Sequence, residues 1–210
     1  MAVIRSDRLE VTGHRSDIGR WRAAQRPADR RLRDYVHGYF ASEGFLAKPL
    51  HERHVPSLEV VIVLNFAAPH RIIAPADQKR TMEYRSAWVV ALQHHHQLRE
   101  AFGARDFMVI RFTPIGAQML LRTPMELLTD RTLELEEIDG QFARLLTAHA
   151  QVTNGWAARF DIVESIIAER LASAPQPPPG LLHSWRISRR LRNISIWHGF
   201  PWNSDVADAI

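Results

Sequence analysis

The chain has 210 residues, 46% of them hydrophobic and 24% charged, a composition typical of a folded globular protein and not of a disordered one. The formal net charge is +4 at pH 7, too small to identify a nucleic-acid partner by itself. The sequence has no cysteine, which excludes disulfides, thiolate metal sites and cysteine nucleophiles and fits a reducing cytoplasm. No apolar run is long enough to cross a bilayer, and the arginine-rich N-terminus does not resemble a secretion signal. We therefore expect a cytoplasmic protein with no membrane partner.

The first half of the chain is rich in predicted strands. Residues up to about Pro27 have no helical period and predict an extended arm and a strand. Asp29–Phe40 places its apolar residues at spacings of three and four, which predicts a short amphipathic helix that runs into a strand. Leu58–Phe66 is a dense β-branched run, as in strands buried on both faces. Further strands are predicted at Arg71–Ile73, Ala87–Leu92 and Phe107–Phe112, and together the strands indicate a barrel or a sandwich.

The second half has a helical period. Pro114 suits the first position of a helix over Ile115–Leu121, because its ring fixes φ and no backbone donor is needed there. Pro124 ends that helix, and a turn at Met125–Leu128 and helices at Asp139–Ala150 and Trp156–Leu171 are predicted after it. Residues 173–180 contain three consecutive prolines, which predict a stiff linker before a last helix over Leu181–Leu191.

A series of motifs in this order resembles the N-terminal half of AraC-type bacterial transcription regulators. The resemblance spans roughly residues 20 to 193 and lies in the order and spacing of the motifs, none of which is specific alone. The motifs are Pro27 with Leu32, Tyr35, Val36, Tyr39 and Phe40; Val55, Pro56 and Ser57 before Val61, Val63 and Asn65; Ile110–Ala117; Leu127, Thr129, Asp130 and Arg131 with Leu133 and Leu135; Leu145 and Leu146; and Trp185 with Leu191.

The resemblance implies an α+β fold, in which a small antiparallel, cupin-like β-barrel is followed by a helical subdomain. It divides the chain into a barrel sensor domain over 1–113, a helical dimerisation subdomain over 114–173, a Pro-rich linker over 174–180 and the start of a truncated or aberrant DNA-binding module over 181–210. In such regulators the barrel binds an effector or assembles with a partner, the helices after it pair two subunits, and two helix-turn-helix units read DNA. We therefore expect a small-molecule effector, a homodimer, and DNA as the partner of the full-length regulator.

The last predicted helix carries candidate DNA contacts at Arg186, Arg189 and Arg190. Arginines here would contact phosphates as part of a whole DNA-binding module, whereas on an isolated helix they would form a solvated face. Too few residues follow Trp185 for two helix-turn-helix units. We therefore expect that this chain alone does not bind a specific operator.

Four residues in the predicted barrel are candidates for effector binding: Asn65, Trp88, Gln93 and Arg111. A small-molecule pocket needs a few polar groups among apolar walls, which these side chains could supply. Each also has a structural alternative. Asn65 and Gln93 could close strand ends, Trp88 could be a core residue, and Arg111 could pair with Glu59 or Glu83, because a charge in a buried strand needs a partner.

Histidines suggest a different function, that of a cupin-like metalloenzyme or metal-binding protein acting on a small molecule. The candidate ligands are His51, His54, His94 and His96, with Glu59 as a possible carboxylate. The spacing departs from the histidine pattern of cupins, and an exposed histidine run is the simpler interpretation. No nucleophile and base pattern or nucleotide-binding loop is visible. We therefore expect a protein without a cofactor or metal that is not an enzyme, and an interaction domain packed solid with apolar residues is the third alternative.

Overall fold

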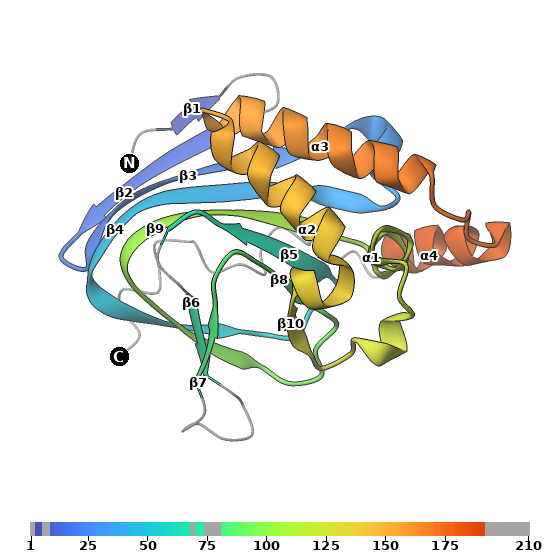
Figure 1. The fold of residues 1–210 in the computed structure, drawn as a ribbon, viewed down its shortest axis with the longest axis horizontal. Helices are drawn as coiled ribbons and strands as arrows, with labels where there is room; N and C mark the ends of the chain where they lie inside the picture. The colour runs from blue at the N-terminus through green and yellow to red at the C-terminus, as the bar shows by residue number, and fades with distance from the viewer. Residues whose placement is uncertain (1–2, 6–8, 68–69, 74–80, 192–210) are drawn as a thin grey trace.

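The computed structural model describes residues 3–5, 9–67, 70–73 and 81–191 of the chain. Over these ranges the chain forms one ten-stranded antiparallel sheet followed by helices (Figure 1). The strand order is β1-β2-β3-β4-β9-β5-β8-β10, with β6 pairing with β7 and β9. The fold class is therefore α+β, an antiparallel curved sheet followed by helices, as predicted. No helix in the described ranges is long and apolar enough to cross a bilayer.

The N-terminal strands form one edge of the sheet. They are β1 (Val3–Arg5), β2 (Glu10–Ser16), β3 (Gly19–Pro27) and the long strand β4 (Val36–His54). The helix predicted over Asp29–Phe40 is wrong, because only the short 3-10 turn η1 (Arg30–Leu32) is helical there. Gly38 instead lies so close to β3 that an added Cβ would be 2.6 Å from the carbonyl oxygen of Arg26. Val36 and Tyr39 are thus buried from β4, and Leu32 from η1.

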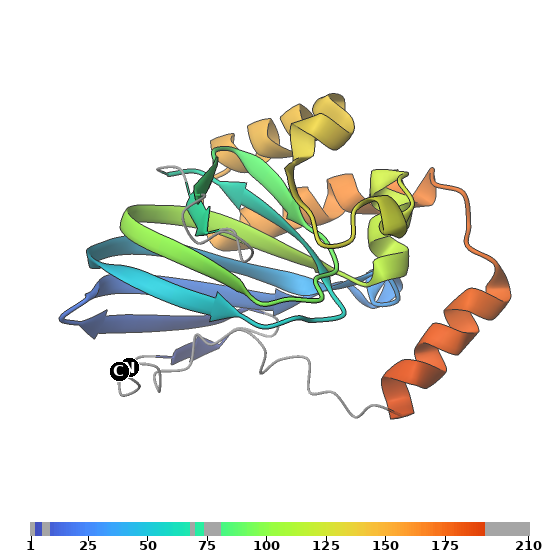
Figure 2. The same cartoon turned by 90° about the horizontal axis from the view of Figure 1, so that it is seen from below.

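Two long strands shape the rest of the sheet. β9 (Gln97–Phe112) pairs with β4 along most of its length, and the register shifts between Leu46 and Leu50. Gly103 in β9 has a φ of 79°, a conformation that favours glycine. The shorter strands are β5 (Val60–Asn65), β6 (His70–Ile73), β7 (Thr81–Tyr84), β8 (Ala87–Val90) and β10 (Thr132–Glu134). The sheet therefore curves, and both halves of β9 contribute to it (Figure 2).

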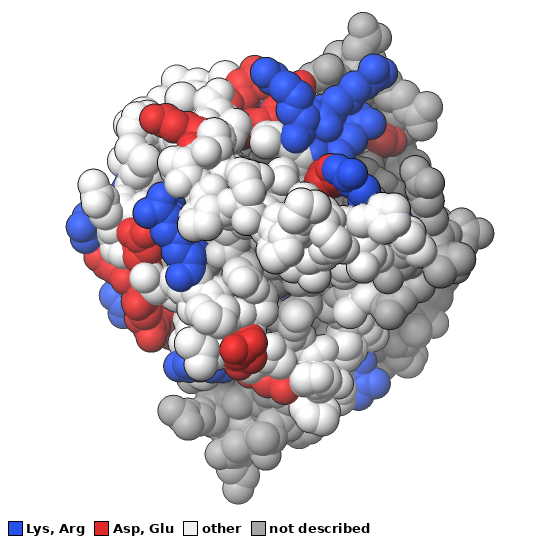
Figure 3. Space-filling view, turned by 90° about the vertical axis from the view of Figure 1, so that its right-hand side faces the viewer, with Lys and Arg blue, Asp and Glu red and all other residues white. Residues whose placement is uncertain are grey.

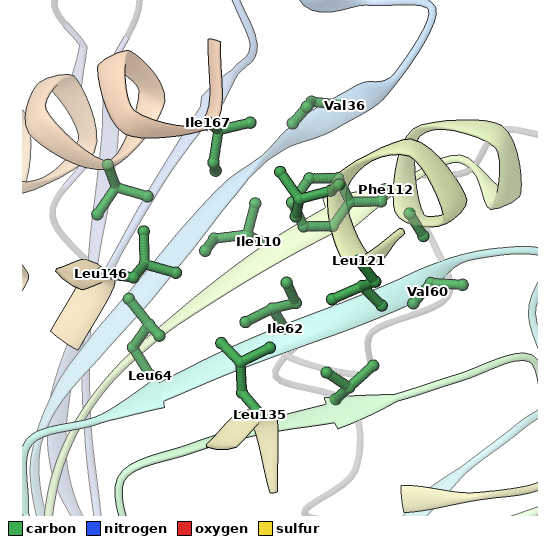
Figure 4. Packing of buried hydrophobic residues seen from close by; sticks show 14 of the residues in the cluster. Val36, Val60, Ile62, Leu64, Ile110, Phe112, Leu121, Leu135, Leu146 and Ile167 are labelled. Atoms are coloured by element: carbon green, nitrogen blue, oxygen red, sulfur yellow. The ribbon is translucent and has the colours of Figure 1, made fainter. Parts of the chain in front are cut away.

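The central strands are buried on both faces, as predicted for residues 58–66. Every residue of β5 is buried, and successive residues point to opposite sides of the sheet. On one side Ile62 and Leu64 join the core formed with the helices, together with Ile110 and Phe112 of β9 (Figure 4). On the other side, Val61 and Val63 join a second cluster whose other members are Tyr84, Trp88, Val90, Phe107 and Val109. We call the side that bears this second cluster the inner face.

The helices cover the side opposite the inner face. α1 (Pro114–Leu121) begins at Pro114 as predicted, and the Thr113 hydroxyl accepts a hydrogen bond from the Gly116 backbone N–H. Next come the turn η2 (Met125–Leu127), α2 (Leu135–Val152) and α3 (Trp156–Ala172). α2 and α3 lie side by side over the sheet (Figures 1 and 2). The apolar stripe of α3 is buried at Phe160, Val163, Ile167 and Leu171, so it packs into the core.

The last described helix is α4 (Pro179–Leu191). It begins two residues before the predicted Leu181, because proline is well tolerated in the first turn of a helix. The guanidinium of Arg186 donates two hydrogen bonds to the carboxylate of Asp34, between η1 and β4. Figure 3 faces the end of the molecule where α1 and α4 lie and shows basic side chains gathered along one edge. The predicted module beyond residue 191 lies outside the described residues.

Candidate functional site

The inner face of β9 carries a charged residue at each end of an apolar segment. Arg105, Phe107, Val109 and Arg111 alternate along the strand and therefore share this face. All four are buried, with exposed fractions of 5%, 5%, 3% and 5%. Because buried charges need partners, each end of this row requires compensating groups from other strands.

The first charged group, which we call the Arg99–Arg105 cluster, consists of Glu52, His54, Arg99 and Arg105. Glu52 lies directly opposite Arg99 in the ladder between β4 and β9, and His54 is two residues further along β4. Neighbouring residues of an antiparallel pair share a face. The His54 Nε2 atom lies 3.4 Å from Oε2 of Glu52. The cluster thus joins two cationic side chains, one carboxylate and one imidazole.

Burial shifts the pKa values in this cluster. Burial lowers the pKa of both Arg99 and Arg105 to about 10, an effect opposed by the negative charge of Glu52. Burial also raises the pKa of Glu52, but its hydrogen bond with His54 and the charges of His54, Arg105 and Arg99 lower it below its usual value overall. Burial lowers the pKa of His54. At neutral pH the cluster therefore holds two positive charges and one negative charge, with His54 neutral.

Aromatic side chains adjoin the Arg99–Arg105 cluster. The Arg105 guanidinium carbon lies 5.1 Å from the centre of the Phe107 ring, and the Phe40 and Phe107 rings are 6.1 Å apart. The Tyr84 and Trp88 rings are 5.6 Å apart. The charge of Tyr84 raises the pKa of Arg99, so this aromatic pair lies near Arg99. The inner face therefore combines cationic groups with flat apolar surfaces.

A second charged group lies at the other end of the β9 row. His37 Nδ1 is 2.7 Å from Oε1 of Glu59, and both side chains are buried. Burial lowers the pKa of Arg111, and the negative charge of Glu59 opposes that effect. Of the two acidic partners proposed for Arg111, Glu59 is thus the one that acts on it, whereas Glu83 is exposed. This interaction supports the structural alternative, in which a carboxylate of the protein compensates the charge of Arg111.

Some buried polar atoms in and near these groups make no hydrogen bond within the described part of the chain. Among them are Oγ of Ser42, Nε of Arg99 and Nε2 of His37. Ser42 lies directly opposite Phe107 and is completely buried, so its hydroxyl is on the inner face. Buried polar atoms of this kind are uncommon in folded proteins and require an explanation, such as a ligand or ordered water.

The other residues predicted to bind an effector differ in their contacts. The Asn65 side-chain amide donates hydrogen bonds to the carbonyl oxygens of Arg85 and Ala67, so it closes the end of β5. Gln93 donates to two backbone carbonyls and accepts a hydrogen bond from Gln97. Trp88 is 1% exposed and belongs to the inner-face cluster. These contacts favour the strand-end alternative for Asn65 and leave Trp88 as part of the inner wall.

His51 and His54 do not lie together. His54 joins Glu52 on the inner face, whereas the His51 side chain is 61% exposed and lies 3.3 Å from the Glu100 carboxylate. They are three positions apart along β4, so they occupy opposite faces. This placement gives them no shared metal ion.

The histidine run at residues 94–96 lies between β8 and β9 rather than on a strand. His94 Nδ1 is 2.7 Å from the Asp130 carboxylate, and its side chain is 72% exposed. His96 Nε2 lies 3.4 Å from a guanidinium nitrogen of Arg53, a cation that disfavours a metal at the same nitrogen. Within the described ranges, no group of three or more His, Asp or Glu side chains is arranged to hold a metal ion.

The candidate DNA contacts lie on α4. Arg186 is engaged by Asp34, while the side chains of Arg189 and Arg190 lie outside the described residues.

Sequence reasoning missed Glu52, Arg99, Arg105 and Ser42 as site residues. The available signal was that Arg99, Arg105 and Arg111 are separated by even numbers of positions, in phase with the predicted strand at Phe107–Phe112. Residues an even number of positions apart on a strand share one face, but this spacing does not tell whether that face is inside or outside.

Several solved structures resemble this fold at low similarity. The crystal structure of FeII HppE is 7% identical, aligned over 53% of this chain and 60% of that one, with a TM-score of 0.38. That of the AraC-like transcriptional activator CuxR is 11% identical over 88% and 70%, with a TM-score of 0.40. That of Lactobacillus farciminis oxalate decarboxylase in complex with formate is 13% identical over 83% and 46%, with a TM-score of 0.31. None of these distant similarities decides the function.

A comparison with curated proteins found no matching relative. The sequence itself matches one family, described as "Domain of unknown function (DUF6597)", over residues 24–134. The matched segment runs from β3 to β10 and contains both charged groups of the inner face. Because it spans more than half of the sequence, this chain belongs to the DUF6597 family.

Proposed function

We propose that this chain is the effector-sensing and dimerisation part of an AraC-type DNA-binding transcription regulator, and that the effector binds at the inner face of the sheet. The observation that carries the proposal is the set of charged side chains at Arg105, which is buried, and at Glu52 and Arg99, which are half-buried. A domain that served only as a scaffold or interaction surface would be more stable with apolar residues there, because buried charges have a large desolvation cost. The order of the sequence motifs supplies the link to AraC-type regulators.

The inner groups are better suited to binding than to catalysis. With pKa values of about 10, Arg99 and Arg105 stay protonated at neutral pH, so they supply fixed positive charge and do not exchange protons readily. Glu52 lies among these cations and stays ionised. Fixed charges of this kind recognise a ligand of complementary charge.

Dimerisation would use α2. The apolar stripe of α3 is buried in the core, but α2 exposes Leu145 by 45% and Val152 by 78%. Residues seven positions apart lie on the same side of a helix. Exposed apolar side chains that line one face of a helix are suited to pairing with a second copy of the same surface.

DNA is the proposed partner of the helix-turn-helix part of the regulator. In the described part of α4, Arg186 already binds the Asp34 carboxylate. We therefore expect no operator-specific binding through this helix, and a mobility-shift assay with the 210-residue chain should detect none.

A reporter fusion tests sensing and pairing together. The full chain is fused to a DNA-binding domain that represses its reporter only as a dimer. We expect repression by the fusion, weakened by Val152→Glu on α2 and retained by Val55→Glu, a control at a residue that is 60% exposed and outside the helices. A fusion that accumulates normally but does not repress would contradict pairing. If direct binding identifies a ligand of the inner face and this ligand does not change repression, the proposed sensing is contradicted.

A further inference from the structure

The last described helix, α4, packs on the rest of the chain through one side. Leu182 and Trp185 are partly buried and pack against the apolar core, whereas Leu181 and Ile187 of the same helix are 50% and 44% exposed. Figures 1 and 2 show α4 at the end of the molecule, apart from α2 and α3. Because part of its apolar surface stays exposed, we expect α4 to detach at a much lower cost in free energy than unfolding of the core.

An ion pair adds a polar contact to this attachment. Nε of Arg186 donates a hydrogen bond to Oδ1 of Asp34 over 3.1 Å, and a second guanidinium nitrogen donates to Oδ2. One planar edge of the guanidinium thus meets both carboxylate oxygens. The two side chains remain 55% and 35% exposed, so solvent weakens the pair and Arg186 can exchange one anionic partner for another.

The backbone that carries the carboxylate is held in a fixed position. The Thr113 hydroxyl donates a hydrogen bond to the Asp34 carbonyl oxygen over 3.0 Å, and the Thr113 backbone N–H donates to the Tyr35 carbonyl oxygen over 2.9 Å. Thr113 directly follows β9 and caps α1. An added Cβ on Gly116 of α1 would lie 2.2 Å from the Tyr35 carbonyl oxygen, so α1 packs tightly against this backbone. Asp34 is therefore fixed relative to β9 and α1, and α4 is the element that can move.

The edge of Arg186 that meets Asp34 is also the edge that would meet a phosphate. Arginine binds carboxylates and phosphates with the same pair of parallel N–H groups. Asp34 therefore occupies the atoms that the predicted DNA contact of Arg186 would use, and the two partners exclude one another. Docking of α4 also keeps Leu182 and Trp185 against the core, so this side of the helix does not face another molecule.

We propose that the docking of α4 is an autoinhibitory contact, in which the Asp34 carboxylate occupies Arg186 in place of a DNA phosphate, and that DNA binding through α4 requires its release. This inference rests on the proposed function, since it states how DNA binding by the regulator is held in check. It goes beyond that function because it assigns the control to one ion pair and one apolar contact, both of which lie outside the inner face.

Two pairs of matched variants of the full chain test the release of α4. Asp34→Asn removes the carboxylate charge, and Glu43→Gln makes the same change in an exposed pair with Arg22 between β3 and β4. Leu182→Ala weakens the apolar contact without a change of charge, and Leu181→Ala makes the same change at the exposed neighbour. We expect faster hydrogen–deuterium exchange in peptides of α4 for Asp34→Asn and Leu182→Ala, and unchanged exchange for the two controls.

Binding to a short DNA duplex of arbitrary sequence, measured by fluorescence anisotropy over a range of salt concentrations, tests the autoinhibition itself. We expect Asp34→Asn and Leu182→Ala each to lower the Kd by roughly two- to fivefold relative to their controls, the range that corresponds to an exposed ion pair. The plot of log Kd against log salt concentration should steepen by about 0.9, the value for one added phosphate contact. Arg186→Gln in either released variant should abolish both changes.

The outcomes separate the inference from the function on which it rests. Unchanged exchange in both Asp34→Asn and Leu182→Ala would mean that neither contact holds α4, and the inference would be wrong. Faster exchange without tighter DNA binding, or tighter binding that persists after Arg186→Gln, would overturn the autoinhibition while leaving the docking in place. If Asp34→Asn does not fold, as judged by circular dichroism, Leu182→Ala decides alone. The proposed function fails separately, if the reporter fusion shows no pairing.

Discussion

The two faces of the central strands differ in composition, because one is packed with apolar residues and the other also carries charged residues. Toward the helices, Ile62, Leu64 and Ile110 pack into an uninterrupted apolar core (Figure 4). Toward the inside, the same strands carry Arg105 and Arg111 at the ends of an apolar row. Burial of apolar surface stabilises the first face, whereas charges on the second reduce stability unless they are paired. The comparison suggests that stability resides on the helix side and recognition on the inner side.

The largest expected effect is on the helix side. Phe160 of α3 is fully buried against Tyr39, with ring centres 5.8 Å apart. We expect Phe160→Ala to lower the free energy of unfolding by about 3–5 kcal/mol, because it removes apolar contacts and leaves a cavity. Urea denaturation followed by circular dichroism measures this. Val55→Ala, at a position that is 60% exposed and outside the helices, is the control and should change it by roughly 0.5 kcal/mol or less. Equal effects would mean that α3 does not anchor the core.

On the inner side, Glu52→Gln should have the next largest effect. It leaves Arg99 and Arg105 without the carboxylate that acts on both, and loss of one partner of a buried ion pair costs on the order of 3 kcal/mol. Glu43→Gln breaks an exposed pair with Arg22 and should cost about 1 kcal/mol or less. If Glu52→Gln is neutral in urea denaturation, the cluster is solvated and the proposed division between the faces is wrong.

A smaller effect concerns pH. The pKa of His54 is lower in the folded protein than its usual value of 6.5, so the unfolded chain binds a proton more readily. Stability should therefore be full above about pH 6.5 and should fall as the pH decreases toward the folded pKa. The depressed pKa of Glu52 acts in the same direction at lower pH, below its usual value of 4.5. Denaturation midpoints from pH 7.5 to 5 should show the decline, and His54→Asn should flatten it. An unchanged slope in that variant would remove His54 from the explanation.

The smallest effect is expected at α4. The ion pair between Arg186 and Asp34 is partly exposed, with side chains 55% and 35% accessible, so Arg186→Gln should change global stability by less than about 1 kcal/mol. Its loss should nevertheless increase protease cleavage after Ala174, where the Pro-rich segment precedes α4. Unchanged cleavage kinetics would mean that the ion pair does not hold α4 in place.

Local patterns in the sequence predicted much of the apolar framework. The β-branched run became β5, and Pro114 begins α1 as predicted. Asp139 also marks a real boundary, because its backbone is not helical and its carboxylate accepts a hydrogen bond from the Phe142 N–H. These features could be predicted because each depends on neighbours a few residues away.

The inner site was harder to predict because it depends on pairing between distant segments. Apart from Leu98, residues 51–54 and 97–100 are polar, so they show no hydrophobic alternation that would indicate a strand. Glu52 meets Arg99 only through the ladder between β4 and β9. Histidine spacing also misled the metal hypothesis, since His94 lies in a connection and not on a strand. Asp29–Phe40 shows that a helical spacing can also arise in a strand.

The most direct test of the central claim is hydrogen–deuterium exchange of the full chain with and without a saturating concentration of a ligand found by direct binding. Our account predicts slower exchange in peptides from β4 and β9 that contain Phe40, Glu52, Arg99 and Arg105, with little change in α2 and α3, and no such protection in Arg105→Gln. Protection confined to the helices or to α4, or protection that persists in Arg105→Gln, would contradict a ligand site on the inner face of the sheet.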